Sequence, residues 1–254
     1  MDHNAEIVDQ FTRQAEGFAQ AQSTRDEALL QRIVSAAQPR PEDTVLDVAC
    51  GPGILACAFA RVTRHATGID LTPAMLDQAR KTQAEQGLAN LTWDAGDVTG
   101  LPYPDRHFDI VSCRFAFHHL PDPLAALREM VRVCRGSGRI VVADSAPETA
   151  KADAFNRVER LRDPSHTRAL PPEELAGIFI AAGLRRPKVE TLRLHGDLDS
   201  LLAHSFPREG DDARVRQMFA DALPSDFLDM APSRADGKIY LSFPIAIVSA
   251  ENEP

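Results

Sequence analysis

The chain has 254 residues, of which 44% are hydrophobic and 26% charged, and it carries a formal net charge of -9. A chain of this length is long enough to bury a sizeable core, and its composition excludes a collagen, a coiled coil and a disordered chain. The acidic balance disfavours nucleic acids and acidic membrane surfaces as partners, because both are polyanions.

Cysteine usage and the start of the chain bear on the cellular compartment. The four cysteines have neither CxxC spacing nor a nearby histidine pair, which argues against a zinc site and against a disulfide framework. The first residues are polar and acidic, unlike a signal peptide, and no run of about 18 apolar residues occurs. We therefore expect a cytoplasmic protein without a metal site or membrane insertion, and with reduced cysteines at Cys50, Cys57, Cys113 and Cys134.

Apolar residues recur at helical spacing through residues 1–40, which predicts a helical N-terminal segment. Gly17 and the stretch from Ser23 to Asp26 are expected to divide this segment into at least two helices. Ser23 or Thr24 is the expected N-cap of the second helix, because a hydroxyl accepts a free backbone N–H there.

From residue 44 onward, strand and helix patterns alternate along the chain. Such alternation predicts a mostly parallel sheet covered by helices on both faces, which is an α/β architecture. Thr72 and Pro73 suit the start of a helix, and Gly87 suits its end. Strands are expected at 44–48, 65–70, 91–96, 108–113, 138–144, near 186–195 and at 239–249, and helices at 53–62, 73–87, 122–134, 151–162 and 173–182.

The turn after the first strand has the glycine pattern of a cofactor-binding turn. Gly51, Gly53 and Ala56 satisfy the pattern G-x-G-x-x-G/A, which also occurs in nicotinamide and flavin dinucleotide sites. Asp47 discriminates between the two kinds of site. A carboxylate there would repel a pyrophosphate, but it suits a ligand with an ammonium and a sulfonium, namely S-adenosylmethionine.

Two further acids end the next strands. Asp70 ends the second strand and is placed to accept hydrogen bonds from ribose hydroxyls, a role common to both kinds of cofactor. Asp97 follows the third strand and suits an adenine amino group. Together with Asp47 they lie at the carboxyl ends of strands, which is the edge where open α/β sheets bind ligands.

Four segments, taken together in their order, resemble the class I S-adenosylmethionine-dependent methyltransferases: VLDVACGPG, TGIDLTPAMLDQAR, GDVTGLPYPDRHFDIVSCRFAFHHLPDP and LREMVRVCRGSGRIVVAD. Within that class, the chain is similar to the small-molecule branch that includes the ubiquinone/menaquinone methyltransferases, over roughly residues 10–146. The resemblance implies a Rossmann-like, mostly parallel seven-stranded sheet with helical lid elements. The family has a glycine where this chain has Ala49.

The resemblance also implies site residues. Asp47 and the turn would hold the methionine end, Asp70 the ribose, and Asp97 with Val98 the adenine edge. Arg114 would lie near the methionine carboxylate or the methyl acceptor. N-terminal helices often close over the cofactor in this family. The residues expected at S-adenosylmethionine are Asp47, Ala49, Gly51, Gly53, Asp70, Leu71, Met75, Asp97, Val98, Arg114, Gln14 and Phe18.

We expect a single domain spanning residues 1–254. Within it, residues 1–40 would form a helical lid, residues 41–146 the cofactor-binding core, and residues 147–254 the substrate-side elements and the last strands. The stretch 197–236 is rich in Asp, Pro and Arg and is expected to be an insertion of mixed helix and loop.

Methyl transfer from a sulfonium is an in-line displacement, in which much of the rate comes from holding the reactants aligned. A histidine would help where the acceptor is a hydroxyl or an acidic carbon. His118 and His119 follow the fourth strand at the ligand edge and are the first candidates. His166, in a polar loop, is a second candidate, and Asp144 at the end of the fifth strand is a candidate for positioning a ligand.

The sequence therefore predicts an S-adenosylmethionine-dependent methyltransferase that modifies O or C of a small organic acceptor, such as a secondary metabolite or a quinone-like compound, and releases S-adenosylhomocysteine. N-methylation and methylation of RNA or protein are alternatives within the class. A dinucleotide-dependent oxidoreductase and a non-catalytic S-adenosylmethionine-binding protein are alternatives outside it. The sequence specifies neither the acceptor nor the oligomeric state, a homodimer included.

Overall fold

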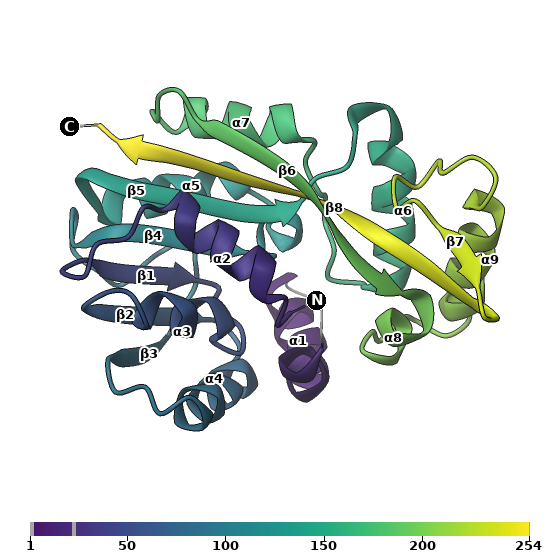
Figure 1. Ribbon diagram of the computed structural model, residues 1–254, viewed down its shortest axis with the longest axis horizontal. Helices are drawn as coiled ribbons and strands as arrows, with labels where there is room; N and C mark the ends of the chain where they lie inside the picture. Colours follow the sequence, from purple (N-terminus) through teal and green to yellow (C-terminus); the bar gives the residue numbers. More distant parts are fainter. Residues whose placement is uncertain (1–2, 22–23, 254) are drawn as a thin grey trace.

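The computed structural model describes residues 3–21 and 24–253. Among these residues, eight strands form one sheet (Figure 1), namely β1 (Thr44–Val48), β2 (His65–Asp70), β3 (Leu91–Ala95), β4 (Phe108–Arg114), β5 (Cys134–Ser145), β6 (Lys188–Asp197), β7 (Ser233–Ala235) and β8 (Lys238–Asn252). Seven of them lie on one path in the order β3-β2-β1-β4-β5-β8-β6, and β7 pairs with β8 beside this path. Strands β1 to β5 pair in parallel, whereas β8 is antiparallel to β5 and β6.

This sheet confirms the predicted α/β class and its mostly parallel order. The largest difference from the predicted strands is in β5, which begins at Cys134 rather than at residue 138. Cys134 lies opposite Phe108 and Arg139 opposite Ile110, so the backbone between them bulges out of register. Ser137 takes a left-handed φ of 68° inside the bulge. The glycines on either side of Ser137 therefore mark an irregularity within the strand.

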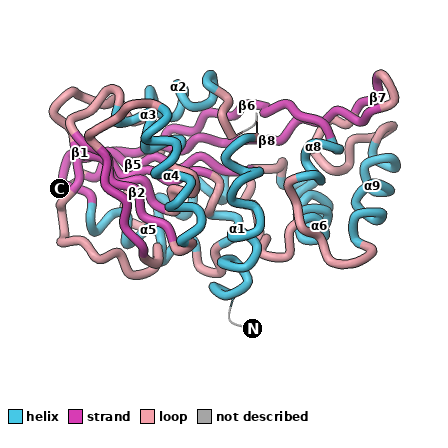
Figure 2. The backbone as a smooth tube through the Cα atoms, turned by 90° about the horizontal axis from the view of Figure 1, so that it is seen from below, coloured by secondary structure: helices cyan, strands magenta, loops and turns pink. Residues whose placement is uncertain are grey.

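Helices cover both faces of the sheet (Figures 1 and 2). Within the described part of the chain, the 3-10 turns are η1 (Phe117–His119) and η2 (Thr149–Lys151). The α-helices there are α1 (His3–Gln20), α2 (Glu27–Ala36), α3 (Ile54–Ala60), α4 (Pro73–Glu85), α5 (Pro123–Val133), α6 (Ala152–Arg162), α7 (Pro172–Ala181), α8 (Leu198–Ala203) and α9 (Asp211–Ala222).

Two apolar layers hold these helices on the sheet. Successive residues of a strand point to opposite faces, so Val45 of β1 packs in the layer with α2 and α3, and Leu46 packs in the layer with α5 and α7. Both residues are fully buried. A parallel sheet buried on both faces has near-continuous hydrophobic strands, as in β1 and β4.

The N-terminal segment forms two helices, as predicted, but their boundaries have different causes. Gly17 does not end α1. It lies inside the helix, where a Cβ would come 2.5 Å from the Nδ1 atom of His204. The N-cap of α2 is Asp26, whose carboxylate accepts a backbone N–H of the first turn at 2.8 Å. Thr24 is not the cap, and Ser23 lies outside the described residues.

The antiparallel strands β6 and β8 carry a third apolar cluster at one end of the molecule (Figure 1). Phe155 of α6, Leu202 of α8 and Phe219 of α9 pack there with Leu241 of β8. Residues 197–236 supply α8, α9 and β7 to this end. Figure 2 shows α1 between this end and the parallel strands, so α1 faces both parts of the molecule.

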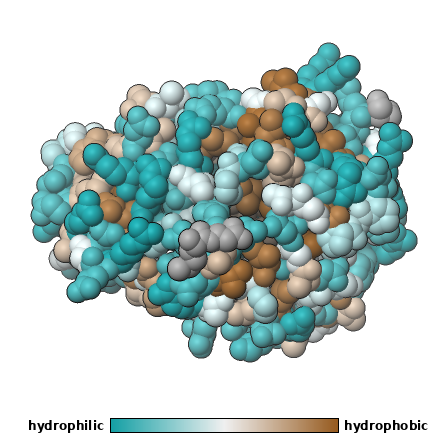
Figure 3. All heavy atoms as spheres, turned by 180° about the vertical axis from the view of Figure 1, so that it is seen from behind, coloured by the Kyte–Doolittle hydropathy of each residue, from teal (hydrophilic) through white to brown (hydrophobic). Residues whose placement is uncertain are grey.

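Apolar residues are unevenly distributed over the surface of the molecule (Figure 3). On the face seen from behind, apolar residues gather down the middle, between more hydrophilic ends (Figure 3). Over residues 3–21 and 24–253, no helix is both long and apolar enough to cross a membrane. The four cysteines are buried and carry free thiols.

Candidate functional site

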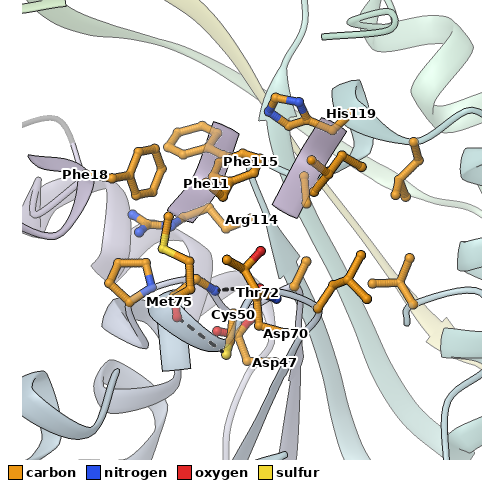
Figure 4. A pocket seen from close by; sticks show the side chains of 18 of the residues that line it. Phe11, Phe18, Asp47, Cys50, Asp70, Thr72, Met75, Arg114, Phe115 and His119 are labelled. Carbon is orange, nitrogen blue, oxygen red and sulfur yellow. Dashed lines mark hydrogen bonds between the residues drawn. The ribbon is translucent and has the colours of Figure 1, made fainter. Parts of the chain in front are cut away.

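The strand order creates a crevice between β1 and β4. The chain moves from β1 outward to β3 on one side, and it continues with β4 and β5 on the other side. Ligands of open α/β sheets bind at such a switch point, beyond the carboxyl ends of the strands. A pocket opens there (Figure 4), and we call it the inner pocket. Its lining residues are Asn4, Ile7, Phe11, Phe18, Asp47, residues 49–52, Leu55, residues 70–72, Met75, Asp97, Val98, residues 114–116, His119 and Leu120.

Asp47 lies at the base of the inner pocket. Its carboxylate is 1% exposed and accepts a hydrogen bond of 2.8 Å from the Ser112 hydroxyl of β4, the residue directly opposite it in the sheet. Burial raises the pKa of Asp47 to about 7, although Ser112 and the nearby Arg114 guanidinium act to lower it. The carboxyl group therefore changes charge near neutral pH, and a cation bound beside it would favour the ionised form.

The turn after β1 is held by left-handed backbone at three positions. Ala49 and Gly51 both have a φ of 52°, and Gly53 has a φ of 73°. Ala49 thus takes the conformation that a glycine would take more easily, at a cost of about 1 kcal/mol. The Gly51 N–H donates to the Asp70 carboxylate at 2.8 Å, which ties the turn to the end of β2.

Asp70 and Asp97 form the rim beside this turn. Asp70 accepts a second backbone N–H, from Thr72 at 2.8 Å, and burial raises its pKa despite these hydrogen bonds. One oxygen of Asp97 accepts the backbone and hydroxyl of Thr99, and the other accepts the side-chain amide of Asn4 at 2.7 Å. Helix α1 is therefore joined directly to the rim of the inner pocket.

The structure brings the residues expected at the cofactor to the inner pocket, except for Gly53 and Gln14. Gly53 instead allows α4 and β3 to pack against the turn, because a Cβ there would lie 2.5 Å from Trp93 and 2.9 Å from Ala79. Sequence analysis missed Phe11 of α1. Phe11 lies two turns before Phe18 on one face of the helix, so helical spacing was the signal that would have found it.

A second pocket, the outer pocket, lies between α1 and the end of the molecule that carries α6 and α8. Phe11, Phe18, Phe115 and His119 line both pockets, and we call these four residues the shared wall (Figure 4). Phe115 has a φ of 56°, which is a strained conformation for a bulky residue. The outer pocket is lined by the shared wall with Gln14, Gln20, Ala21, Thr24, His118, Ser145, Glu159, Arg162, Asp163, residues 194–197, Ser200, Leu201, His204, Ser205, Leu241, Phe243 and Ile245.

Arg114 supports the shared wall from below. Its guanidinium lies 5.3 Å from the centre of the Phe115 ring, and it donates a hydrogen bond of 2.8 Å to the carbonyl of Thr24. Burial lowers the pKa of Arg114 to about 10, which leaves it charged at neutral pH. It is therefore a fixed positive charge next to Asp47.

His118 and His119 follow β4 in the turn η1, and they have opposite electrostatic surroundings. His118 Nδ1 is hydrogen-bonded to the Asp144 carboxylate, and the His118 N–H lies 3.2 Å from the same group. Burial alone would lower the pKa of His118, but the Asp144 charge outweighs it and raises that pKa. Burial lowers the pKa of His119 to about 4, and the neighbouring His118 adds to this effect.

His166 does not reach either pocket. Its side chain is 4% exposed, and its Nε2 atom is 2.7 Å from the Asn156 side-chain oxygen. The loop that carries it does not hang free over the site, because the backbone of Thr167 donates to the carbonyl of His118 at 2.8 Å. Burial lowers the pKa of His166. The sequence could not indicate this, because a polar loop has the same composition whether it is solvated or packed.

The donor groups of the two pockets do not form a metal centre. Among residues 3–21 and 24–253, no group of three or more His, Cys, Asp or Glu side chains is arranged to hold a metal ion. Both pockets are instead built from carboxylates, histidines and aromatic rings. Such a lining suits an organic ligand.

Comparisons with known proteins complete the description of the site. The model of the family described as methyltransferase domain matches residues 46–142. The uncharacterized methyltransferase YcgJ of Bacillus subtilis is 34% identical over 192 residues, or 75% of this chain and 76% of that protein. Its solved structure gives a TM-score of 0.81 at 27% identity, covering 89% of this chain and 98% of that chain. The ubiquinone/menaquinone biosynthesis C-methyltransferase UbiE of Bdellovibrio bacteriovorus is 37% identical over 116 residues, or 45% of this chain and 49% of that protein.

The packing role of Gly53 can be tested by stability. We expect Gly53→Ala to lower the free energy of unfolding by about 1–3 kcal/mol, because the added Cβ meets Trp93 in a left-handed backbone. The matched control is Gly177→Ala in α7, where no atom lies within 4 Å of the added Cβ, and it should raise stability by roughly 0.5–1 kcal/mol. Urea unfolding measures both variants, and an unchanged midpoint for Gly53→Ala would contradict the packing role.

Proposed function

Because the chain belongs to the methyltransferase domain family and is a class I methyltransferase, we propose that it binds S-adenosylmethionine in the inner pocket and methylates O or C of a small organic acceptor in the outer pocket. The observation that carries this proposal is that the two pockets adjoin, because the four residues of the shared wall line both of them. A ligand in each pocket would therefore lie next to the other. Bound S-adenosylmethionine supplies an electrophilic methyl group on a sulfonium. The chain's own residues have to bind, align and deprotonate the reactants.

The charges of the inner pocket support a cationic cofactor. Three carboxylates line it, from Asp47, Asp70 and Asp97, against one guanidinium, from Arg114. Asp47 faces the ammonium group in our proposal, and Arg114 lies close enough to favour the carboxylate of the same amino acid moiety. Asp70 accepts the ribose hydroxyls, since each of its oxygens holds only one backbone N–H. A pyrophosphate would be repelled by the same set of acids.

The lining of the outer pocket supports an acceptor that is not an anion. Arg162 is the one guanidinium among its described lining residues, and Glu159 engages it through three hydrogen bonds while Ser205 takes another. Among the described lining residues, an anionic acceptor would therefore find no free guanidinium. The rings of the shared wall and Phe243 favour an aromatic acceptor. The UbiE relatives are named for ubiquinone and menaquinone biosynthesis, which supports a quinone-like ring.

His118 is the proton acceptor in this proposal. Its Nδ1 atom is engaged by Asp144, so the proton removed from an acceptor hydroxyl or acidic carbon goes to Nε2. Asp144 holds the ring in place and stabilises the imidazolium that forms. The Asp144 charge raises the pKa of His118, which makes its Nε2 a stronger base.

Calorimetric titration with S-adenosylhomocysteine tests the cofactor assignment. We expect the unmodified protein to release or absorb heat on binding, and Asp70→Ala to bind about tenfold to a hundredfold more weakly, because hydrogen bonds to a charged group are lost. The control is Asp77→Ala, an exposed acid on α4 that pairs with Arg80. Melting temperatures of all variants show that they are folded. An unmodified protein that gives no heat would rule out the cofactor proposal.

The pKa of Asp47 makes a second, independent prediction about the same ligand. With a pKa of about 7 in the free protein, roughly a tenth of Asp47 is ionised at pH 6 and roughly nine tenths at pH 8. If the ammonium group binds the ionised form, the dissociation constant for S-adenosylhomocysteine should fall about tenfold between these pH values. Asp47→Asn should bind weakly and without this pH dependence. A pH-independent dissociation constant in the unmodified protein would contradict contact between Asp47 and the ammonium.

A methyl-transfer screen over phenols, quinols and indoles tests the acceptor side. For any acceptor found, we expect His118→Asn to lower kcat by about 10² to 10⁴, the usual contribution of a general base. The rate of the unmodified protein should rise with pH through the raised pKa of His118, and Asp144→Asn should move this midpoint to lower pH. The control is His65→Asn, because His65 begins β2 and so lies at the end of that strand away from the pockets. An unchanged kcat in His118→Asn, or no methylation of any acceptor by a protein that binds S-adenosylhomocysteine, would contradict this assignment.

A further inference from the structure

The segment between α6 and α7 is hydrogen-bonded to the turn that carries His118 and His119. The backbones of Thr167 and Arg168 donate to the carbonyl of His118, at 2.8 and 3.1 Å. Two residues earlier, Ser165 lies against the ring of His119, with both its hydroxyl and its carbonyl oxygen 3.1 Å from Nδ1. The sequence offers no motif for this contact, because 46 residues separate the two partners.

The Ser165 hydroxyl donates its only hydrogen to another residue, Asp163. Ser165 donates it to the Asp163 carboxylate at 2.6 Å, and the Ser165 backbone N–H donates to the same carboxylate oxygen at 2.9 Å. Burial would raise the pKa of Asp163, but the nearby charges and these hydrogen bonds outweigh it and hold that pKa well below its usual range. Asp163 is therefore an acceptor only, and the Ser165 oxygen has lone pairs left for another donor.

These bonds determine which nitrogen of His119 carries its hydrogen. A carbonyl oxygen only accepts, and the Ser165 hydroxyl oxygen accepts as well once its hydrogen points to Asp163. Both neighbours of Nδ1 thus require a donor, so a neutral His119 has its hydrogen on Nδ1 and a lone pair on Nε2.

The ring edge that carries Nε2 is the edge left for the pockets. His119 is part of the shared wall, and its ring meets that of Phe11 from α1 with 4.9 Å between centres (Figure 4). The ionisable groups that face it are His118 in the same turn, Asp144 from β5, Asp163 from the end of α6, and His166, whose ring centre lies 6.3 Å away. With a pKa of about 4, His119 stays neutral at working pH, so its lone pair is available.

We propose that Asp163 is a positioning residue that acts through Ser165 to hold His119 as the Nδ1–H tautomer, so that Nε2 accepts a hydrogen bond from an O–H or N–H group of the methyl acceptor. The use of this hydrogen bond rests on the proposed function. The tautomer itself does not, because it follows from contacts within the protein. His119 then orients the acceptor through this group, while His118 beside it receives the proton of a different group, the hydroxyl or acidic carbon that is methylated.

The same carboxylate also contacts the helix that covers the site. Gln14 of α1 donates to the second oxygen of Asp163 at 3.2 Å. Ser165 uses the first oxygen, so the two contacts are separable by mutation. This gives a variant that breaks the contact with α1 and leaves the contact with His119 in place.

Nitrogen-15 NMR of the histidine side chains tests the tautomer directly, on the full chain saturated with S-adenosylhomocysteine and without any methyl acceptor. Long-range correlations from the ring carbons' protons distinguish a protonated from an unprotonated ring nitrogen. His119→Asn identifies the resonances by their loss. We expect Nδ1–H and an unprotonated Nε2 in the unmodified protein, and the same in Gln14→Ala and in Asp153→Asn, an exposed acid on α6.

Asp163→Ala should lose this single tautomer, because the Ser165 hydroxyl loses its acceptor and its hydrogen is released toward Nδ1. Ser165→Ala is the second variant if Asp163→Ala does not fold, and it should weaken the preference by removing one acceptor. Ser165→Thr should restore it. Nε2–H in the unmodified protein, or an unchanged tautomer in both Asp163→Ala and Ser165→Ala, would overturn the proposal.

Kinetics then separate this positioning role from the proposed chemistry. With an acceptor in hand, Ser165→Ala should raise its KM about fivefold to tenfold, the size of one hydrogen bond, with a smaller change in kcat. A lower kcat at unchanged KM would contradict an orienting role for His119. If the proposed function is wrong, calorimetry shows no binding of S-adenosylhomocysteine. The NMR experiment still tests the tautomer in that case, because the tautomer depends only on contacts within the protein.

Discussion

The carboxylate of Asp70 is the contact on which the inner pocket depends. It accepts one backbone N–H from Gly51 and one from Thr72, and so it fixes the turn after β1 against the start of α4. Burial of this charge is costly and raises its pKa, and the two hydrogen bonds offset part of that cost. Without it, the turn would keep the bond from the Cys50 N–H to the Ile69 carbonyl at 3.0 Å, but it would lose its link to the start of α4.

The outer pocket is built differently, from elements that meet only in the folded chain. Strands β6 and β8 carry α8 and α9 away from the parallel strands, and α6 packs with them around a separate apolar cluster. Helix α1 lies between the two parts, so its Phe11 and Phe18 belong to both pockets. The stretch 197–236 thereby supplies one part of the lining of the outer pocket, together with the histidines that follow β4.

Much of the fold and of the inner pocket was predictable because its signals are local. Alternating strand and helix patterns indicated the parallel sheet, and the acids at strand ends indicated a ligand edge. Local patterns are less informative where a residue acts through a partner that is distant in the sequence. Gly17 suggested a helix break but lies inside α1 against His204, and Gly53 resembled a cofactor contact but makes room for Trp93. His166 had the composition of a solvated loop but is buried beside Asn156.

The sequence by itself determined the order of the elements, the class of the sheet and the position of three acids at its edge, since strand periodicity and turn residues act over a few neighbours. Only the tertiary structure decided how the histidines differ. His118 meets Asp144 and His119 meets Ser165, across 26 and 46 residues of chain. The Asp144 charge raises the pKa of His118, whereas burial and the neighbouring His118 lower the pKa of His119 despite its bond to Ser165. Burial and neighbouring charge determine those shifts, and both exist only once the chain has folded.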